Sequence, residues 1–493
     1  MRELQMKLIN DPSTARWFQL LNILEQKHVV TTLDLAKQIG ISQRTIITDI
    51  QTLKKHFGES AHFISSKNGY HFQEQNMPLY NQKKQELLAN EPIYEIIGNI
   101  FYGELDSIAD TAHYLNYSPG SLRRILSSIQ PILRTYNLKL SMNPINICGD
   151  ESSIRKFFLD FYYEGFQTPH TLHPPQGFHE EFLRMFDSYG EYIELDTGSP
   201  IACFYYTLYI VIERFKQGYT VQLPPALATS VYKEKDFNKL TLFLSHLGEK
   251  YGFTLPKHEI AWIHYTILTK RPIREKASEE LFYARFGQWP EIEHLAASLI
   301  TYHAYSDWDI EQLTIFFKSF LLAKKINDAI CPTLNRTMTD TITSIKKSHP
   351  DTFRQNMTFL KKHVHDHQFS SHFWIDIAAD LTAYCHILAI RYSPRKNVYF
   401  LLEGDHLITQ TIRAQAIYYL GNSHNLFFMS IWSLSHAVLQ DNQVDLVITN
   451  YEPYVSEYLR NKDYILTNTI LHRHDWQKIF SCLSLSWNDL LYL

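Results

Sequence analysis

Short polar and basic side chains gather within seven positions of the sequence, at residues 118–124. The cluster comprises Ser118, Gly120, Ser121, Arg123 and Arg124. No Asp or Glu occurs between residues 111 and 149, although Arg and Lys do. Guanidinium groups bind phosphate oxygens and the guanine edge, and serine hydroxyls bind either group. This composition indicates contact with double-stranded DNA; the alternative is a solvated basic helix face.

A second cluster of polar side chains lies 76 residues earlier and is less basic. It comprises Gln43, Arg44, Thr45 and Thr48, and we expect Asp49 to face outward among them. A carboxylate on that face would repel DNA phosphates, so base contact is less strongly indicated here. Packing or phosphate positioning is the alternative role.

The element that positions each cluster is a helix-turn-helix pattern, present twice in register. Ser42 and Ser118 each precede the second helix of a copy, where a serine hydroxyl can cap free backbone N–H groups. Apolar residues then follow at spacings of four, three and four, which places them on one helical face. They are Ile46, Ile50, Leu53 and Phe57 in the first copy, and Leu122, Leu126, Ile129 and Leu133 in the second.

Each copy has the flanking elements of a winged domain. A helix is predicted over 15–26 before the first copy, and a hairpin turning at Asn68-Gly69 after it. An apolar helix through Ile93 and Ile100 precedes the second copy, and a strand–turn–strand pattern over 138–149 follows it. The sequence therefore predicts two winged helix-turn-helix domains.

The remaining chain predicts a mainly α, multidomain protein. Long amphipathic or buried helices fill residues 151–395, and the charged segment 271–280 is expected to divide them. Strands at 397–402, 425–429 and 445–449 alternate with helices, which is typical of a parallel α/β sheet.

Composition excludes several classes of protein. The chain has 493 residues, a net charge of −4 and 45% hydrophobic residues, so any nucleic-acid binding depends on a local patch. Its longest apolar run, Ile201–Ile212, is too short to span a membrane. The five cysteines form no CxxC pair, and the histidine groups at 363–367 and 472–474 lack ligand partners. Enzyme motifs are absent. We expect a cytoplasmic protein with no cofactor, no metal and no membrane contact.

These parts together resemble the Mga family of virulence regulators of Gram-positive bacteria, which includes AtxA. The resemblance implies five domains: winged helix-turn-helix domains at 1–76 and 77–150, phosphotransferase-system regulation domains (PRD-like) at 151–278 and 279–395, and an EIIB-like α/β domain at 396–493. In that family the last domain helps to form dimers. Its segment 403–406 lacks the cysteine of EIIB enzymes, and His406 is a weak phosphate candidate.

The regulation-domain pattern includes Arg214 and Glu259. Sugar-responsive relatives place a phosphorylatable His seven residues before this Arg and another seven after this Glu, where this chain has Thr207 and Thr266. The resemblance leaves His264, His303 and His386 as candidates for phosphorylation by the phosphotransferase proteins HPr and EI. Each could instead be an ordinary core or surface histidine.

The sequence thus predicts a DNA-binding transcriptional regulator, an activator that works as a homodimer or higher oligomer. The main alternative is an enzyme, a sugar phosphotransferase component with accessory nucleic-acid-binding domains. A second is an RNA-binding antiterminator, but such proteins begin with a small all-β domain, and the two repeats do not fit one.

Overall fold

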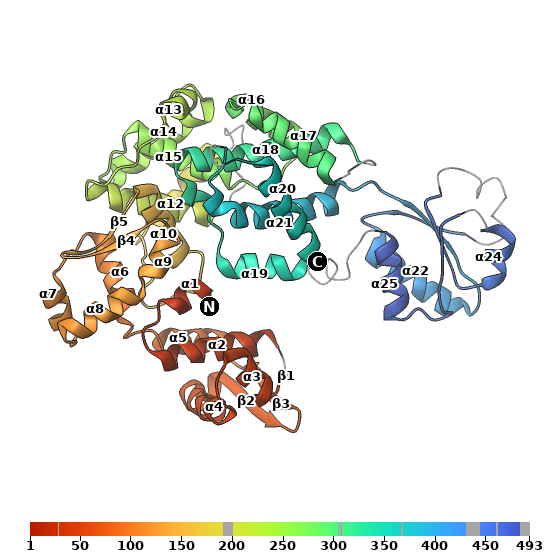
Figure 1. Cartoon of the computed structure of the whole chain (residues 1–493), viewed down its shortest axis with the longest axis horizontal. Helices are drawn as coiled ribbons and strands as arrows, with labels where there is room; N and C mark the ends of the chain where they lie inside the picture. The colour runs from red at the N-terminus through yellow and green to blue at the C-terminus, as the bar shows by residue number, and fades with distance from the viewer. Residues whose placement is uncertain are drawn as a thin grey trace. The chain divides into compact units, whose positions relative to one another are not determined.

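The computed structural model describes residues 1–27, 29–190, 201–303, 305, 308–365, 368–429, 444–459 and 462–483. Helices dominate these residues, and the sheets are small (Figure 1). The chain forms two compact units. One comprises Met1–His303, Glu311–Lys346 and Asp351–Asp380, and the other comprises Ala304–Ile310, Lys347–Pro350 and Leu381–Leu493. A mainly α, multidomain protein was predicted, and this is confirmed.

The first N-terminal domain follows a short helix, α1 (Glu3–Lys7). Its elements are α2 (Pro12–Gln26), β1 (Val29–Val30), α3 (Thr32–Ile39), α4 (Gln43–Phe57), β2 (Ala61–Ser66), β3 (Gly69–Glu74) and α5 (Met77–Glu86). The strands form an antiparallel sheet in the order β1-β3-β2. Helix α3 ends at Gly40, whose φ of 79° suits the turn between the two helices. The predicted hairpin is present, whereas β1 is an additional strand.

The second domain repeats the arrangement. It comprises α6 (Pro92–Tyr102), α7 (Ile108–Tyr114), α8 (Pro119–Ser128), α9 (Gln130–Arg134), β4 (Lys139–Met142) and β5 (Ile145–Cys148). The second helix of this copy is interrupted, unlike that of the first. Pro131 has no N–H to donate to Ser127, so α8 ends and α9 starts anew.

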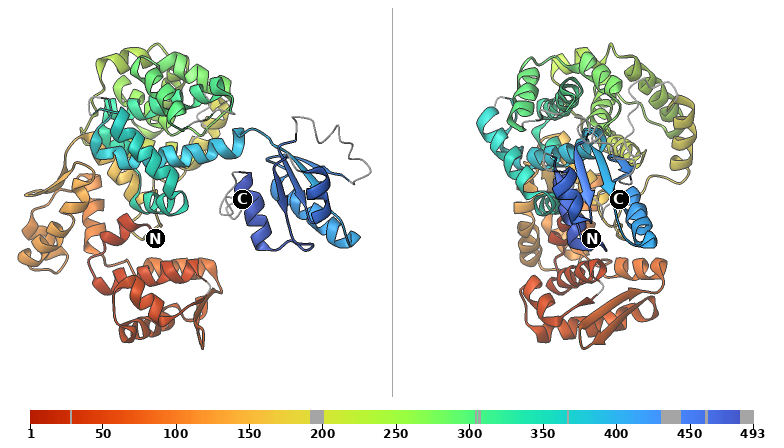
Figure 2. Two further views of the ribbon diagram at one scale, coloured as in Figure 1. Left: turned by 45° about the vertical axis from the view of Figure 1, so that its right-hand side comes forward. Right: turned by 90° about the vertical axis from the view of Figure 1, so that its right-hand side faces the viewer.

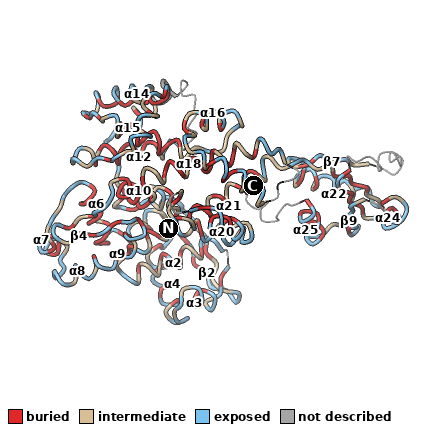
Figure 3. The backbone as a smooth tube through the Cα atoms, turned by 45° about the horizontal axis from the view of Figure 1, so that its top comes forward, coloured by how far each residue is buried: buried red, intermediate tan, exposed pale blue. Residues whose placement is uncertain are grey.

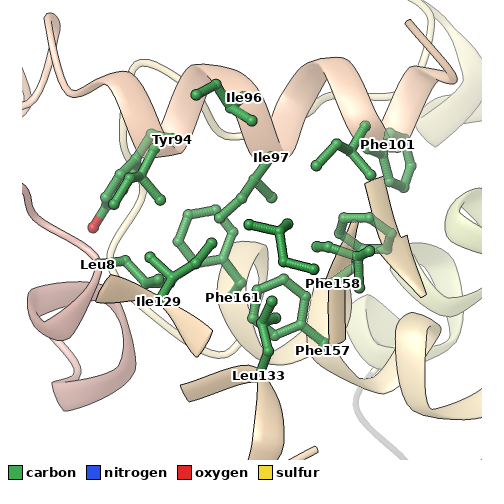
Figure 4. Packing of buried hydrophobic residues seen from close by; sticks show 14 of the residues in the cluster. Leu8, Tyr94, Ile96, Ile97, Phe101, Ile129, Leu133, Phe157, Phe158 and Phe161 are labelled. Carbon is green, nitrogen blue, oxygen red and sulfur yellow. The ribbon is translucent and has the colours of Figure 1, made fainter. Parts of the chain in front are cut away.

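The core of the second domain continues into the next helix, α10 (Glu151–Tyr162). Figure 4 shows Phe157 and Phe161 of α10 among Ile97 of α6, Ile129 and Leu133. All five side chains are buried in one cluster. The boundary predicted at residue 150 therefore falls within a continuous hydrophobic core.

In the described residues that follow, up to residue 392, the chain forms helices and no strands. They are α11 (Phe178–Gly190), α12 (Ile201–Lys216), α13 (Pro225–Val231), α14 (Lys235–Tyr251), α15 (Lys257–Thr269), α16 (Lys276–Phe286), α17 (Glu291–His303), α18 (Ile310–Ile330), α19 (Thr339–Ser348), α20 (Pro350–His363) and α21 (Trp374–Tyr392). Figure 3 shows α12 and α18 largely buried. Helix α16 begins inside the expected linker 271–280, and its Phe282 and Phe286 pack in the same core as α15.

One helical segment within the described residues, Ser371–Tyr392, is long and apolar enough to cross a membrane, with a mean hydropathy of 1.4. Half of that segment is buried inside the protein. A buried core helix has the same composition, so this observation is weak evidence for a membrane span.

The C-terminal unit contains a parallel sheet, shown in blue in Figure 2. Its elements are β6 (Asn397–Leu401), α22 (His406–Leu420), β7 (Asn425–Phe428), β8 (Leu446–Thr449), α24 (Glu452–Tyr458), β9 (Tyr464–Leu466) and α25 (Arg473–Cys482). The strand order is β7-β6-β8-β9. Helices α22 and α25 cover one face, and α24 covers the other. The predicted parallel α/β arrangement is present, and the short helix expected after β7 lies outside the described residues.

Candidate nucleic-acid interface

The two second helices, α4 and α8, begin with the same cap. Ser42 Oγ accepts from the backbone N–H of Thr45, and Ser118 Oγ accepts from that of Ser121, both at 3.1 Å. In both caps the two side-chain oxygens also lie 2.9 Å apart. Capping therefore occupies these hydroxyls. The primary role of Ser42, Thr45, Ser118 and Ser121 is to fix the start of each helix.

The remaining predicted residues of both helices face the solvent. Gln43, Arg44 and Thr48 are exposed on α4, and Gly120, Arg123 and Arg124 are exposed on α8. Leu122 and Leu126, which come before and after the two arginines in the sequence, are fully buried and hold α8 in its domain. Neither arginine forms an ion pair with any acidic side chain in the described parts of the chain. Both guanidinium groups are therefore available to a ligand.

Asp49 does not lie on the exposed face of α4, and this sequence expectation was wrong. Only 5% of the residue is exposed. Its carboxylate accepts from Arg16 Nε at 2.5 Å, from Arg16 Nη2 at 3.0 Å and from Trp17 Nε1 at 2.9 Å. Asp49 therefore ties α4 to α2, and the outer face of α4 loses a negative charge that would repel phosphate.

Sequence reasoning missed further polar groups near the two helices. Lys54 and Lys55 are exposed at the end of α4, and Lys67 is exposed at the tip of the β2–β3 hairpin. Tyr114 and Tyr117 are exposed just before α8. A helix ending in basic residues and a hairpin tip carrying lysine are signals that could have identified the first three.

The charged residues of the regulation-domain pattern form a buried network. Arg214 Nη2 lies 2.8 Å from Glu151 Oε2, and Arg155 Nη1 lies 2.6 Å from Glu259 Oε2. Arg155 Nε also lies 3.0 Å from Glu151 Oε1, and Glu259 accepts from the backbone N–H of Val221. The network joins α10, α12 and α15, so Arg214 and Glu259 have a structural role.

The three candidate histidines differ in accessibility. His264 is buried on α15, and burial lowers its pKa to about 4. His303 is half-buried at the end of α17, with Nε2 2.8 Å from Asn356 Oδ1, and burial also lowers its pKa. His386 is half-buried on α21, with its ring centre 4.3 Å from that of His349. Since a phosphocarrier must reach a ring nitrogen, burial disfavours His264.

The loop after β6 is closed by its own hydrogen bonds. Glu403 and Asn450 exchange two of them, at 2.8 and 2.7 Å, and Tyr454 donates to the Glu403 carboxylate. Asp405 caps α22 by accepting from the backbone N–H groups of Leu407 and Ile408. A carboxylate therefore occupies the helix end that would otherwise attract a phosphate.

The fold and the interface define a protein with two winged helix-turn-helix domains, each presenting a polar, capped recognition helix. Comparison with family models supports this directly. A helix-turn-helix domain model matches residues 16–72, and the Mga helix-turn-helix domain model matches residues 80–162. The second match includes α10, in agreement with the shared core.

Curated relatives have regulatory names. The capsule synthesis positive regulator AcpB of Bacillus anthracis is 22% identical over 412 residues, which cover 79% of this chain and 83% of the relative. AcpA of the same organism, also named a capsule synthesis positive regulator, is 26% identical over 45% of this chain and 47% of the relative. A putative trans-acting regulator of Streptococcus pneumoniae serotype 4 (strain ATCC BAA-334 / TIGR4) is 26% identical over 32% of each chain.

These matches confirm the resemblance to Mga-type and AtxA-like regulators. The chain is a DNA-binding transcriptional regulator, and neither the family models nor the names of these relatives indicate an enzyme.

Proposed function

We propose that the chain is a cytoplasmic transcriptional activator that binds promoter DNA with both recognition helices. The observation that carries the proposal is the pair of identically capped helices, α4 and α8, with exposed polar first turns. Each helix enters a major groove, where side chains from its first turns reach the base edges. The names of AcpB and AcpA, both positive regulators, favour activation.

The two arginines of α8 take different roles in this proposal. Arg123 and Arg124 are neighbours, about 100° apart around a helix, so they cannot both reach the same base. One reads a base edge and the other holds a phosphate. On α4, the hydroxyl of Thr48 is already used, because it donates to the Arg44 carbonyl at 3.1 Å. Arg44 and Gln43 are therefore the base-reading candidates on this helix.

The experiment measures binding of Arg123→Ala and Arg124→Ala to specific and random duplexes across a salt series. The base-reading variant loses about 1–3 kcal/mol and specificity, while the phosphate-holding variant weakens all sequences and lowers the salt slope by about one. Ser128→Ala, at an exposed position of the same helix, is the matched control. Wild-type binding by both folded arginine variants would refute the assignment of α8 as a DNA reader.

Regulation by phosphorylation is the second part of the proposal. His303 and His386 are the favoured acceptors, because His264 is buried. Phosphorylation adds up to about two negative charges and can remodel a helix contact. Incubation with HPr and EI should give an acid-labile label that is lost in His303→Ala or His386→Ala. A label that survives both substitutions contradicts this choice of residues.

Self-association through the C-terminal unit is the third part. Helix α22 exposes a row of apolar side chains, among them Leu407, Ile417 and Tyr418, the last with 82% of its surface exposed. Apolar and aromatic surface is typical of the centre of an interface. Among the other aromatic residues of this unit, Tyr419 and Phe428 are half-buried and so offer less surface, and Trp432 lies outside the described residues.

The test replaces Ile417 and Tyr418 by Asp and measures the mass of the full chain by light scattering. We expect the assembly to dissociate to monomers, since two carboxylates would be buried without partners. Thr411→Asp, at an exposed α22 position between Leu407 and Ile417, tests how far the interface extends. An unchanged mass in the Ile417 and Tyr418 variant refutes this surface as the interface.

A further inference from the structure

A small cavity lies inside the helical region, and its largely apolar wall includes three basic side chains. It is lined by Arg155 and Lys156 of α10, Thr207 of α12, Thr266 of α15 and, just beyond α15, Lys270. About 20 Å³ is open to the centre of a water molecule, which is room for one or two waters or one small ion. Three cations contribute to the wall, and no carboxylate does.

One hydroxyl on this wall lacks a partner. Thr207 is only 1% exposed, and its Oγ1 makes no hydrogen bond within the described structure. Thr266 differs, because its hydroxyl donates to the Trp262 carbonyl at 2.9 Å. A buried hydroxyl without a partner is unfavourable, so the position of Thr207 Oγ1 calls for a bound acceptor or donor in the cavity.

The carboxylates that neutralise the three cations are not part of the cavity wall. Lys156 Nζ lies 2.5 Å from Asp160, and Arg155 is held by Glu151 and Glu259. Lys270 Nζ lies 4.0 Å from Glu164 and 3.6 Å from Cys203 Sγ, and these groups raise the pKa of Lys270 despite its burial.

Two further properties of these lysines favour an anion. Burial lowers the pKa of Lys156, so its charged form would gain from another negative group nearby. The side chain of Lys270 is 30% exposed, so one residue of the cavity wall also reaches the solvent.

We propose that this cavity binds a small inorganic oxyanion of the size of phosphate. Thr207 Oγ1 donates a hydrogen bond to it, and Lys156 and Lys270 provide charge-assisted contacts. The volume excludes a phosphorylated sugar, so the ligand is the free ion. The cavity lining includes no residue of α4 or α8 and none of the candidate histidines, and the proposal goes beyond the proposed function.

The first experiment uses the full chain and isothermal titration calorimetry. Inorganic phosphate, sulfate and glucose 6-phosphate are titrated separately at constant ionic strength, because screening alone changes charged proteins. We expect saturable binding of phosphate and a matching rise in the unfolding temperature, with no binding of glucose 6-phosphate. Potassium chloride at the same ionic strength is the control for screening. An equal rise in the unfolding temperature with phosphate and with potassium chloride would overturn the proposal. Binding of glucose 6-phosphate with the same affinity as phosphate would also overturn it.

The second experiment compares variants. Thr207→Val keeps the shape of the side chain and removes no hydrogen bond, so without phosphate its stability should equal or exceed that of the wild type. Its affinity for phosphate should fall about tenfold, the effect of one hydrogen bond to a charged group. Lys270→Gln should also weaken binding, whereas Lys216→Gln, at an exposed position of the same helix as Thr207, should not. Wild-type phosphate affinity in both Thr207→Val and Lys270→Gln would overturn the assignment.

Discussion

Replacing Asp49 by Ala separates two opposite views of the first recognition helix. If this carboxylate faced DNA, its removal would leave the fold intact and strengthen binding, because a repulsive charge would be gone. In the structure it instead accepts two hydrogen bonds from Arg16 and one from Trp17. The substitution should therefore destabilise the domain and weaken DNA binding.

The magnitude follows from the groups left behind. Removing one partner of a buried ion pair costs about 3–5 kcal/mol when the other charge stays buried. The side chain of Arg16 is 22% exposed, so its guanidinium regains some hydration when the carboxylate is removed. The indole N–H of Trp17, in contrast, loses its acceptor. We expect a loss of about 3 kcal/mol. That is a large fraction of the stability of a domain of this size, which is about 4–11 kcal/mol.

Hydrogen exchange of the full chain measures this loss in the first domain alone. Amides of α2 and α4 should exchange faster in Asp49→Ala, while those of α12 and α15 should not change. Asp49→Asn, which retains one acceptor oxygen, should give a smaller effect, and Gln51→Ala on the exposed side of α4 should give none. Unchanged protection together with tighter DNA binding would refute the reasoning.

Three other substitutions test the interior and the first wing. Glu259→Ala leaves the buried guanidinium of Arg155 with only Glu151, which it shares with Arg214, and it should lower the free energy of unfolding of the helical region by about 3 kcal/mol in denaturant titration; a loss below 1 kcal/mol would contradict this. Because the folded pKa of His264 is about 4 and its unfolded pKa about 6.5, the unfolded state binds more protons between these values, and stability is lost as the pH is lowered through this range. This one group should remove about 2 kcal/mol between pH 7 and pH 5, and a His264→Phe variant that keeps the full pH dependence would refute the effect. Gly69→Ala places a methyl group 2.4 Å from the Val30 carbonyl at a φ of +122°, so hydrogen exchange should show loss of the β1–β3 pairing; intact protection would contradict this.

Local patterns in the sequence predicted much of the fold. Serine caps and the four-three-four spacing located α4 and α8, because both signals act within one helix. The Asn68-Gly69 turn located the first hairpin for the same reason. The sequence alone therefore predicted the two helix-turn-helix elements and the exposed residues on α4 and α8.

Features that depend on distant partners could not be predicted in this way. Asp49 is turned inward by Arg16, which lies 33 residues away along the chain. The charged segment 271–280 resembled a linker, yet Arg271 and Glu279 form a buried ion pair within it, and Phe282 just beyond belongs to the core. The cavity beside Thr207 requires four helices, α10, α12, α15 and α18, to be placed together.

The core shared by α10 and the second winged domain has a mechanical consequence. Two domains joined by a loose linker can turn independently, so a signal in one is lost before it reaches the other. Here Tyr136, at the base of the second wing, donates to Asp160 of α10, and Phe157 packs beneath it. Since packed cores transmit strain rather than absorb it, α10 and the second winged domain are coupled as one body. Any rotation of α10 would then turn that whole domain, including α8, the helix that we propose to read DNA.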